Sequence, residues 1–130
     1  MTVPAPLALE IPWREPGEVL AAAARHPFPV FLDSARRDHP AGRFSFLAVD
    51  PFTTLASRDG LVLLDDAPAD GPPFHLLQQQ LEAWRLTPVP GLPPFQGGAA
   101  GVFSYDLLHA LERVPPHRHD DQGFPDLQLG

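Results

Sequence analysis

The chain has 130 residues, no cysteine and a hydrophobic fraction of 44%, which suits one domain with its own core. Sixteen acidic residues against nine basic ones give a net charge of −7, so no nucleic-acid-binding surface is expected. No apolar run approaches the ~20 residues that span a bilayer, and the N-terminus lacks a secretory signal pattern. We therefore expect no membrane contact and a cytoplasmic location. All nine basic residues are arginine, which excludes chemistry on a lysine amine.

The N-terminal part of the chain carries patterns typical of three strands and a helix. Apolar residues alternate along residues 7–13, which predicts a strand at a sheet edge because Pro12 has no N–H for a ladder. A helix is expected to begin near Pro16 and to end near Arg25, since proline suits a first turn. Two further strands are expected at residues 28–34 and 43–49.

A hairpin and a longer helix are predicted in the middle of the chain. The dipeptide Asp59-Gly60 stands between two apolar runs, residues 52–57 and 61–64. Because both residues can adopt positive φ, this pattern predicts a tight β-hairpin. Residues 73–86 place their large apolar side chains in one stripe with a 3.6-residue period, which predicts an amphipathic helix.

The C-terminal part is expected to hold a strand, a helix and an incomplete final element. Glycines open a predicted strand at residues 97–105, and Asp106 is expected to cap a last helix. Residues 126–130 begin to alternate and then stop, which we interpret as a strand without a partner in this chain and as a sign of truncation. Hairpins outnumber βαβ patterns, so we expect an α+β fold with a mainly antiparallel sheet and flanking helices, in one domain over residues 1–130.

Three clusters have compositions that occur in functional sites, but their contexts favour structural roles. The glycines of residues 97–101 precede a strand rather than a helix, so we expect close backbone packing there instead of a phosphate site. Residues 117–121 combine His117 and His119 with acids, but beside prolines they indicate a solvated connector and no metal site. The serines lack a nucleophile motif, so no catalytic residue is assigned.

A fourth cluster combines an acid, a hydroxyl and an arginine. Asp33 and Ser34 follow an apolar strand, and Arg43 comes after a turn. A carboxylate and a hydroxyl can hold an ammonium group, while a guanidinium can hold a carboxylate, so the three residues could bind an amino acid. The structural alternative is a strand-end turn with ordinary capping by Asp33 and Ser34. Spacing alone favours that alternative.

Three segments resemble the N-terminal region of component I of the chorismate-utilising synthases. They are residues 28–35 (FPVFLDSA), 42–51 (GRFSFLAVDP) and 95–106 (FQGGAAGVFSYD). The resemblance extends over about residues 7–130 in one order. Within the family, the aminodeoxychorismate (para-aminobenzoate) branch is the nearer match, and the anthranilate branch is the alternative.

The resemblance implies a part of a larger enzyme. Members of the family convert chorismate with magnesium and with ammonia from a glutamine amidotransferase subunit. Their lysine, acid–base and magnesium-binding residues lie in a larger C-terminal part, so no catalytic residue or cofactor is carried over to this chain. The expected partners are therefore that C-terminal catalytic part and the amidotransferase. The expected fold is about half of the family's two-sheet sandwich, with exposed apolar surface that favours self-association.

The resemblance also gives the acid-hydroxyl cluster a possible ligand. In anthranilate synthases, the matching segment forms part of a tryptophan feedback site. Asp33 and Ser34 match it, and Arg43 falls where a basic residue assists. A second interpretation, from another class of protein, is a stand-alone module that binds an amino acid.

Overall fold

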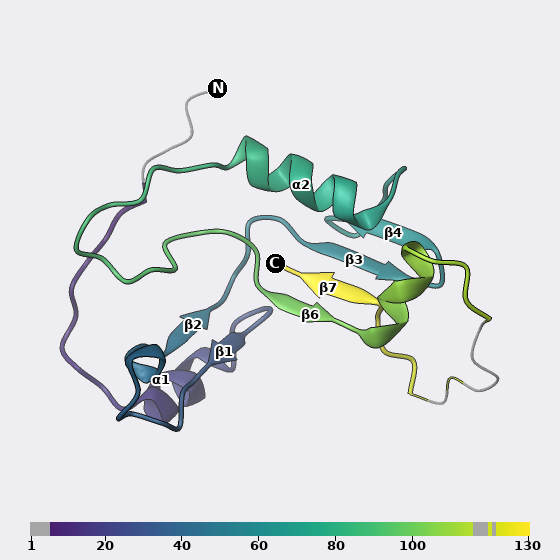
Figure 1. Ribbon diagram of the computed structural model, residues 1–130. Coiled ribbons are helices and arrows are strands. Elements are labelled where there is room, and N and C mark those ends of the chain that lie inside the picture. The colour runs from purple at the N-terminus through teal and green to yellow at the C-terminus, as the bar shows by residue number, and fades with distance from the viewer. Residues whose placement is uncertain (1–5, 116–119, 121) are drawn as a thin grey trace. The chain divides into compact units, whose positions relative to one another are not determined.

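The computed structural model describes residues 6–115, 120 and 122–130 (Figure 1). The chain divides into two compact units, each built from two stretches of sequence. The first comprises Met1–Pro51 and Trp84–Gly98, and the second comprises Phe52–Ala83 and Ala99–Gly130. We refer to them as unit 1 and unit 2.

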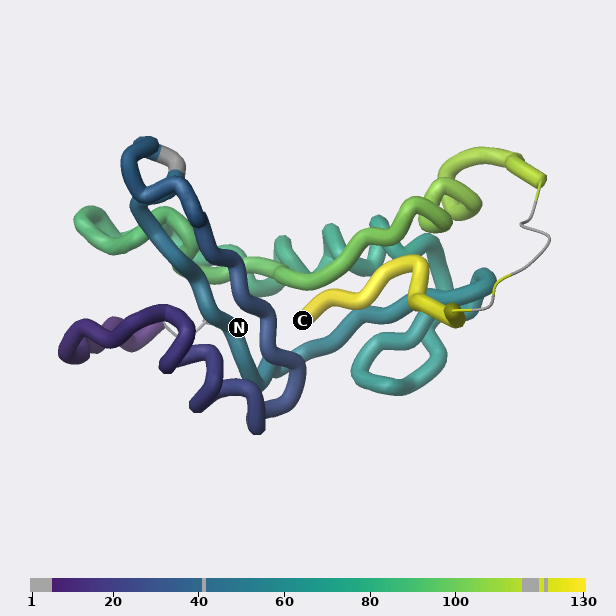
Figure 2. The backbone as a smooth tube through the Cα atoms, turned by 90° about the horizontal axis from the view of Figure 1, so that it is seen from below, coloured from purple at the N-terminus to yellow at the C-terminus, as the bar shows by residue number. Residues whose placement is uncertain are grey.

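Unit 1 consists of one helix, a two-stranded sheet and a proline-rich loop. Helix α1 (Pro16–Ala23) begins with proline in its first turn, as predicted. Strands β1 (Val30–Leu32) and β2 (Phe46–Ala48) pair antiparallel, with Val30 opposite Ala48, and run side by side in the tube of Figure 2. The short 3₁₀ helix η1 (Pro40–Gly42) lies in the loop between them. Both predicted strands are therefore confirmed, although each is shorter than expected.

A glutamine orders the proline-rich loop of unit 1. The backbone N–H of Val89 donates to the Gln96 side-chain carbonyl at 2.7 Å, and the Gln96 amide donates to the Val89 carbonyl at 3.0 Å. Phe95 in the same loop packs edge-on against Phe46, with 5.9 Å between ring centroids. The loop thereby contacts β2, the strand that carries one side of the candidate site.

Unit 2 is an antiparallel sheet covered by a helix. Its strands are β3 (Leu55–Arg58), β4 (Leu61–Leu64), β5 (Ala67–Pro68), β6 (Gly101–Phe103) and β7 (Leu127–Leu129), in the spatial order β5-β4-β3-β7-β6. Helix α2 (Pro73–Ala83) contributes Leu76 to the core beside the sheet. The other buried members of that core are Leu55, Val62, Leu107, Leu127 and Leu129. The expected α+β class with antiparallel pairing is confirmed.

The predicted hairpin forms around Asp59 and Gly60. Both residues have positive φ, at 51° and 80°, and β3 pairs with β4 so that Arg58 lies opposite Leu61. Two consecutive left-handed residues are the geometry that joins strands through a two-residue turn. A local dipeptide signal was therefore sufficient to predict this contact.

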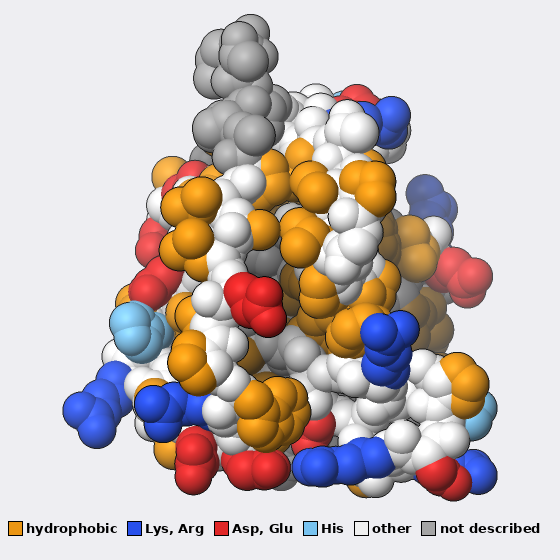
Figure 3. Space-filling model, turned by 90° about the vertical axis from the view of Figure 1, so that its left-hand side faces the viewer, with side chains coloured by type: hydrophobic (Ala, Val, Ile, Leu, Met, Phe, Trp, Pro, Cys, Tyr) orange, Lys and Arg blue, Asp and Glu red, His pale blue; other side chains and the backbone are white. Residues whose placement is uncertain are grey.

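The prediction of a strand at residues 7–13 is wrong. The structure has neither helix nor strand there, and its large apolar side chains are 73–83% exposed. Alternation makes a segment suitable for a sheet, but a strand forms only where its backbone groups find a partner. Other hydrophobic side chains also reach the surface on the face shown in Figure 3.

The expectation of an unpaired last strand is also wrong. Strand β7 lies inside the sheet, with Leu129 opposite Leu55 of β3 on one side and Gly101 of β6 on the other. Leu127 and Leu129 are only 0% and 2% exposed. These partners are distant in sequence, so no local pattern revealed them.

The last predicted helix differs in type and in its cap. The structure has a six-residue 3₁₀ helix, η2 (Tyr105–Ala110), and its N-cap is Ser104. Asp106 lies in the first turn instead, where a carboxylate is favoured by the unpaired N–H groups. No helix in the described part of the chain is long and apolar enough to cross a membrane.

Candidate functional site

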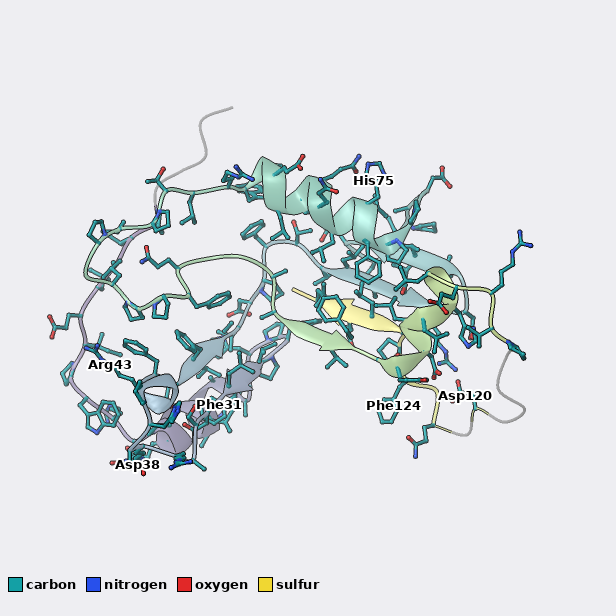
Figure 4. The ribbon with its side chains drawn as sticks, in the orientation of Figure 1. Phe31, Asp38, Arg43, His75, Asp120 and Phe124 are labelled. Carbon is teal, nitrogen blue, oxygen red and sulfur yellow. The ribbon has the colours of Figure 1, made fainter. Side chains whose placement is uncertain are left out.

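Unit 1 contains a cavity of about 730 Å³ beside its two-stranded sheet. Its wall is formed by the start of α1, by β1 and β2, and by the loop between those strands. Figure 4 labels Phe31, Asp38 and Arg43, which represent three parts of this wall. The polar and charged lining residues are Arg14, Asp33, Ser34, Arg37, Asp38, His39, Arg43 and Ser45.

The structure places all three predicted site residues on the wall of this cavity. Asp33 and Arg43 are exposed, and Ser34 is half-buried. Asp33 and Ser34 directly follow β1, while Arg43 precedes β2, so strand pairing brings together residues about ten positions apart. Gly42 permits the tight loop, because a Cβ there would overlap the backbone carbonyl of Arg36.

Ser45 orients the Asp33 carboxylate. The register ends with Leu32 opposite Phe46, so Asp33 and Ser45 flank this last pair of the ladder. The Ser45 hydroxyl donates to Asp33 Oδ1 at 2.5 Å. The second carboxylate oxygen accepts no hydrogen bond from the described residues, which leaves an acceptor beside the cavity.

Arg37 and Arg43, which line the cavity, and the neighbouring Arg36 differ in their partners. Arg36 Nε lies 3.2 Å from Asp38 Oδ1, and an Arg37 nitrogen lies 3.7 Å from a Glu15 oxygen. Arg43 makes no ion pair with a described residue, and its guanidinium carbon lies 5.0 Å from the ring centroid of Phe44. When a guanidinium lies over an aromatic ring, its N–H groups remain available to donate hydrogen bonds to an anion.

The arrangement is better suited to binding an α-amino acid than to catalysing a reaction. The site offers an oriented carboxylate, a hydroxyl and an arginine, which match the charges of an ammonium and a carboxylate on one ligand. Phe31, Phe44 and Phe46 add apolar lining for a side chain. Ser45 is not among the residues predicted for this site. The signal that could have identified it is its position between Phe44 and Phe46 on a predicted strand.

The structure also describes the glycine cluster at residues 97–101 and part of the cluster at residues 117–121. Gly101 has φ 154°, and a Cβ there would overlap the carbonyl of Gln128, so the predicted close backbone approach is confirmed. His117 and His119 lie outside the described residues. Asp120 accepts hydrogen bonds from the Gly123 N–H at 2.8 Å and from Arg58 at 3.4 Å. Within the described residues, no three potential ligands gather as a metal site.

Comparison with known proteins identifies relatives of one class, the component 1 chains of two synthases. Aminodeoxychorismate synthase component 1 of Salmonella typhimurium is 38% identical over 138 residues, which cover 96% of this chain and 29% of that protein. The Escherichia coli protein of the same name is 30% identical, with the same coverage. Anthranilate synthase component 1 of Mycobacterium tuberculosis is 36% identical over 82% of this chain and 22% of its own length.

The resemblance found in the sequence is therefore confirmed. The chain is similar, over nearly all of its length, to aminodeoxychorismate synthase component 1, and over most of it to anthranilate synthase component 1. It spans between about a fifth and a third of the length of these curated relatives. No family model matches the chain.

Proposed function

We propose that the chain is the N-terminal part of component 1 of an aminodeoxychorismate synthase. Such an enzyme aminates chorismate to 4-amino-4-deoxychorismate, the precursor of para-aminobenzoate for folate synthesis. The observation that carries the proposal is the 38% identity to an enzyme of that name over 96% of this chain. The anthranilate branch is the alternative, supported by 36% identity over 82%.

In this proposal, the chain has a structural and ligand-binding role. Catalysis and magnesium binding belong to the remaining polypeptide of component 1, and ammonia comes from a glutamine amidotransferase subunit. The chain has no lysine, and its described residues offer no cluster of metal ligands, so no step of the reaction is assigned to it. The two antiparallel sheets would form about half of a larger sandwich.

The cavity of unit 1 is proposed as part of an amino-acid site, with tryptophan as the ligand. Asp33 and Ser34 would contact the ammonium group and Arg43 the carboxylate. All three residues lie on the wall of one cavity, which supports a role in ligand binding over a role limited to capping the end of a strand. If the chain instead acts alone, the same cavity would make it an amino-acid-binding module.

The reaction product distinguishes the two synthase branches. The complete component 1 that contains this chain is incubated with chorismate, magnesium and ammonium, and the products are separated by chromatography. We expect 4-amino-4-deoxychorismate. Anthranilate as the product would replace the proposed branch with the alternative, and no conversion would contradict both.

A further inference from the structure

Among the described residues, two carboxylates line the unit 1 cavity, and they have different neighbours. Asp33 Oδ1 accepts a hydrogen bond from the Ser45 hydroxyl at 2.5 Å. Asp38, which is labelled in Figure 4, has its Oδ1 3.2 Å from Nε of Arg36. A guanidinium brings a full positive charge to its carboxylate, whereas a hydroxyl brings a hydrogen bond and no net charge. Asp33 is therefore held without being neutralised, while the charge of Asp38 is shared with an arginine.

The hydrogen bond from Ser45 fixes one oxygen of Asp33 and leaves the other open. Within the described residues, Asp33 Oδ2 accepts no hydrogen bond. Both side chains are exposed, and a carboxylate in water without such a contact can occupy several rotamers. The two residues flank the last pair of the β1–β2 ladder, so the paired backbones hold the hydroxyl and the carboxylate at this separation. Ser45 thus reduces the side-chain entropy that Asp33 loses when it binds a cation.

The positively charged part of the site depends on a different contact. The guanidinium carbon of Arg43 lies 5.0 Å from the ring centroid of Phe44, and Ser45 bonds to Asp33 instead. The groups proposed to bind the two charged ends of an amino acid are therefore held by separate, adjacent residues at the start of β2. A change in Ser45 should affect recognition of one end only.

We propose that Ser45 is a positioning residue that makes this cavity selective for ligands with an ammonium group. It acts through Asp33, which it keeps both oriented and negatively charged, and it makes Asp33 rather than Asp38 the acceptor for the ammonium. This inference rests on the proposed amino-acid site and adds to it the residue that determines which charged end is recognised. A threonine at this position would serve equally, because it keeps the hydroxyl.

The experiment uses three probes that share an indole ring and differ in their charged ends. Tryptophan has an ammonium and a carboxylate, tryptamine has the ammonium alone, and indole-3-propionate has the carboxylate alone. Their affinities for the complete component 1 are measured by titration calorimetry, with the weaker probes in competition with tryptophan. Ser45→Ala should bind tryptophan and tryptamine about three- to tenfold more weakly, which corresponds to ordering one side chain on binding. Its affinity for indole-3-propionate should be unchanged, and Ser45→Thr should bind all three probes as wild type does.

Two further comparisons identify the acceptor and control for folding. Asp33→Asn should weaken tryptophan binding more than Asp38→Asn does. Thr87→Ala removes a hydroxyl from an exposed residue of unit 1 that does not line the cavity, and it should bind all three probes as wild type does. Because Ser45 is exposed, Ser45→Ala should also retain the wild-type circular dichroism spectrum.

The outcomes separate this proposal from the amino-acid site on which it rests. Equal weakening of all three probes by Ser45→Ala would overturn the proposal, since a general structural role has no preference for one charged end. Unchanged tryptophan binding in Ser45→Ala, together with a loss in Asp33→Asn, would also overturn it but would leave the amino-acid site in place. No tryptophan binding by the wild type would reject the site and this proposal together.

Discussion

Asp33 and Ser34 show how the same residue types can serve a turn or a ligand. On sequence alone, capping of a strand end was the better explanation. In the structure, the hydrogen bond to Asp33 comes from Ser45 of the opposite strand, and all three predicted residues line one cavity. A carboxylate held by a neighbour is oriented before a ligand arrives, which lowers the ordering cost of binding.

The hydroxyl of Ser34 provides a test of the amino-acid site. In the complete component 1, Ser34→Ala should weaken tryptophan binding about tenfold or more, because a hydrogen bond to a charged group contributes about 1.5–3 kcal/mol. Isothermal titration calorimetry measures the affinity. Thr87→Ala is the control, since it removes a hydroxyl from a residue outside the cavity lining and should leave the affinity unchanged. Equal affinities in wild type and Ser34→Ala would leave Ser34 as a turn residue.

At the scale of elements, most local signals predict the structure, apart from the type and cap of η2, whereas distant pairings are not predicted. The Asp59-Gly60 turn, the proline that begins α1 and the periodicity of α2 each depend on a few adjacent residues, and the structure confirms them. Whether residues 7–13 form a strand, and where β7 pairs, depends on residues elsewhere in the chain. The same limit applies to the site, where the residue types were predictable but the β1–β2 register that brings Ser45 to Asp33 was not.

The position of β7 makes the end of the chain a main source of stability in unit 2. Leu127→Ala should lower the free energy of unfolding by about 2–5 kcal/mol, because it leaves a cavity at a fully buried site. Leu61→Ala in β4 is the matched control, since Leu61 is 54% exposed, and it should change stability by no more than about 0.5 kcal/mol. Urea unfolding followed by circular dichroism compares the two. A similar small effect from both would show that β7 is not held in the sheet in solution.

At the scale of the whole molecule, each of the two units has its own sheet, and many large apolar side chains of the described residues are exposed. The 130 residues correspond to 29% of the Salmonella typhimurium relative. Exposed apolar patches larger than a few hundred Å² often mark surfaces where a protein binds a partner.

The proposed division of labour within component 1 predicts that this chain alone does not convert chorismate. The reaction is assigned to the remaining polypeptide, and this chain has no lysine to act as a nucleophile or base. The purified 130-residue chain, at a concentration well above that of the complete component, is incubated with chorismate, magnesium and ammonium. Chromatography should show no product above a buffer blank, while the complete component, measured in parallel, shows turnover. Product formed by the chain alone would place catalytic groups among its own residues, and its unit 1 cavity would then be the first site to mutate.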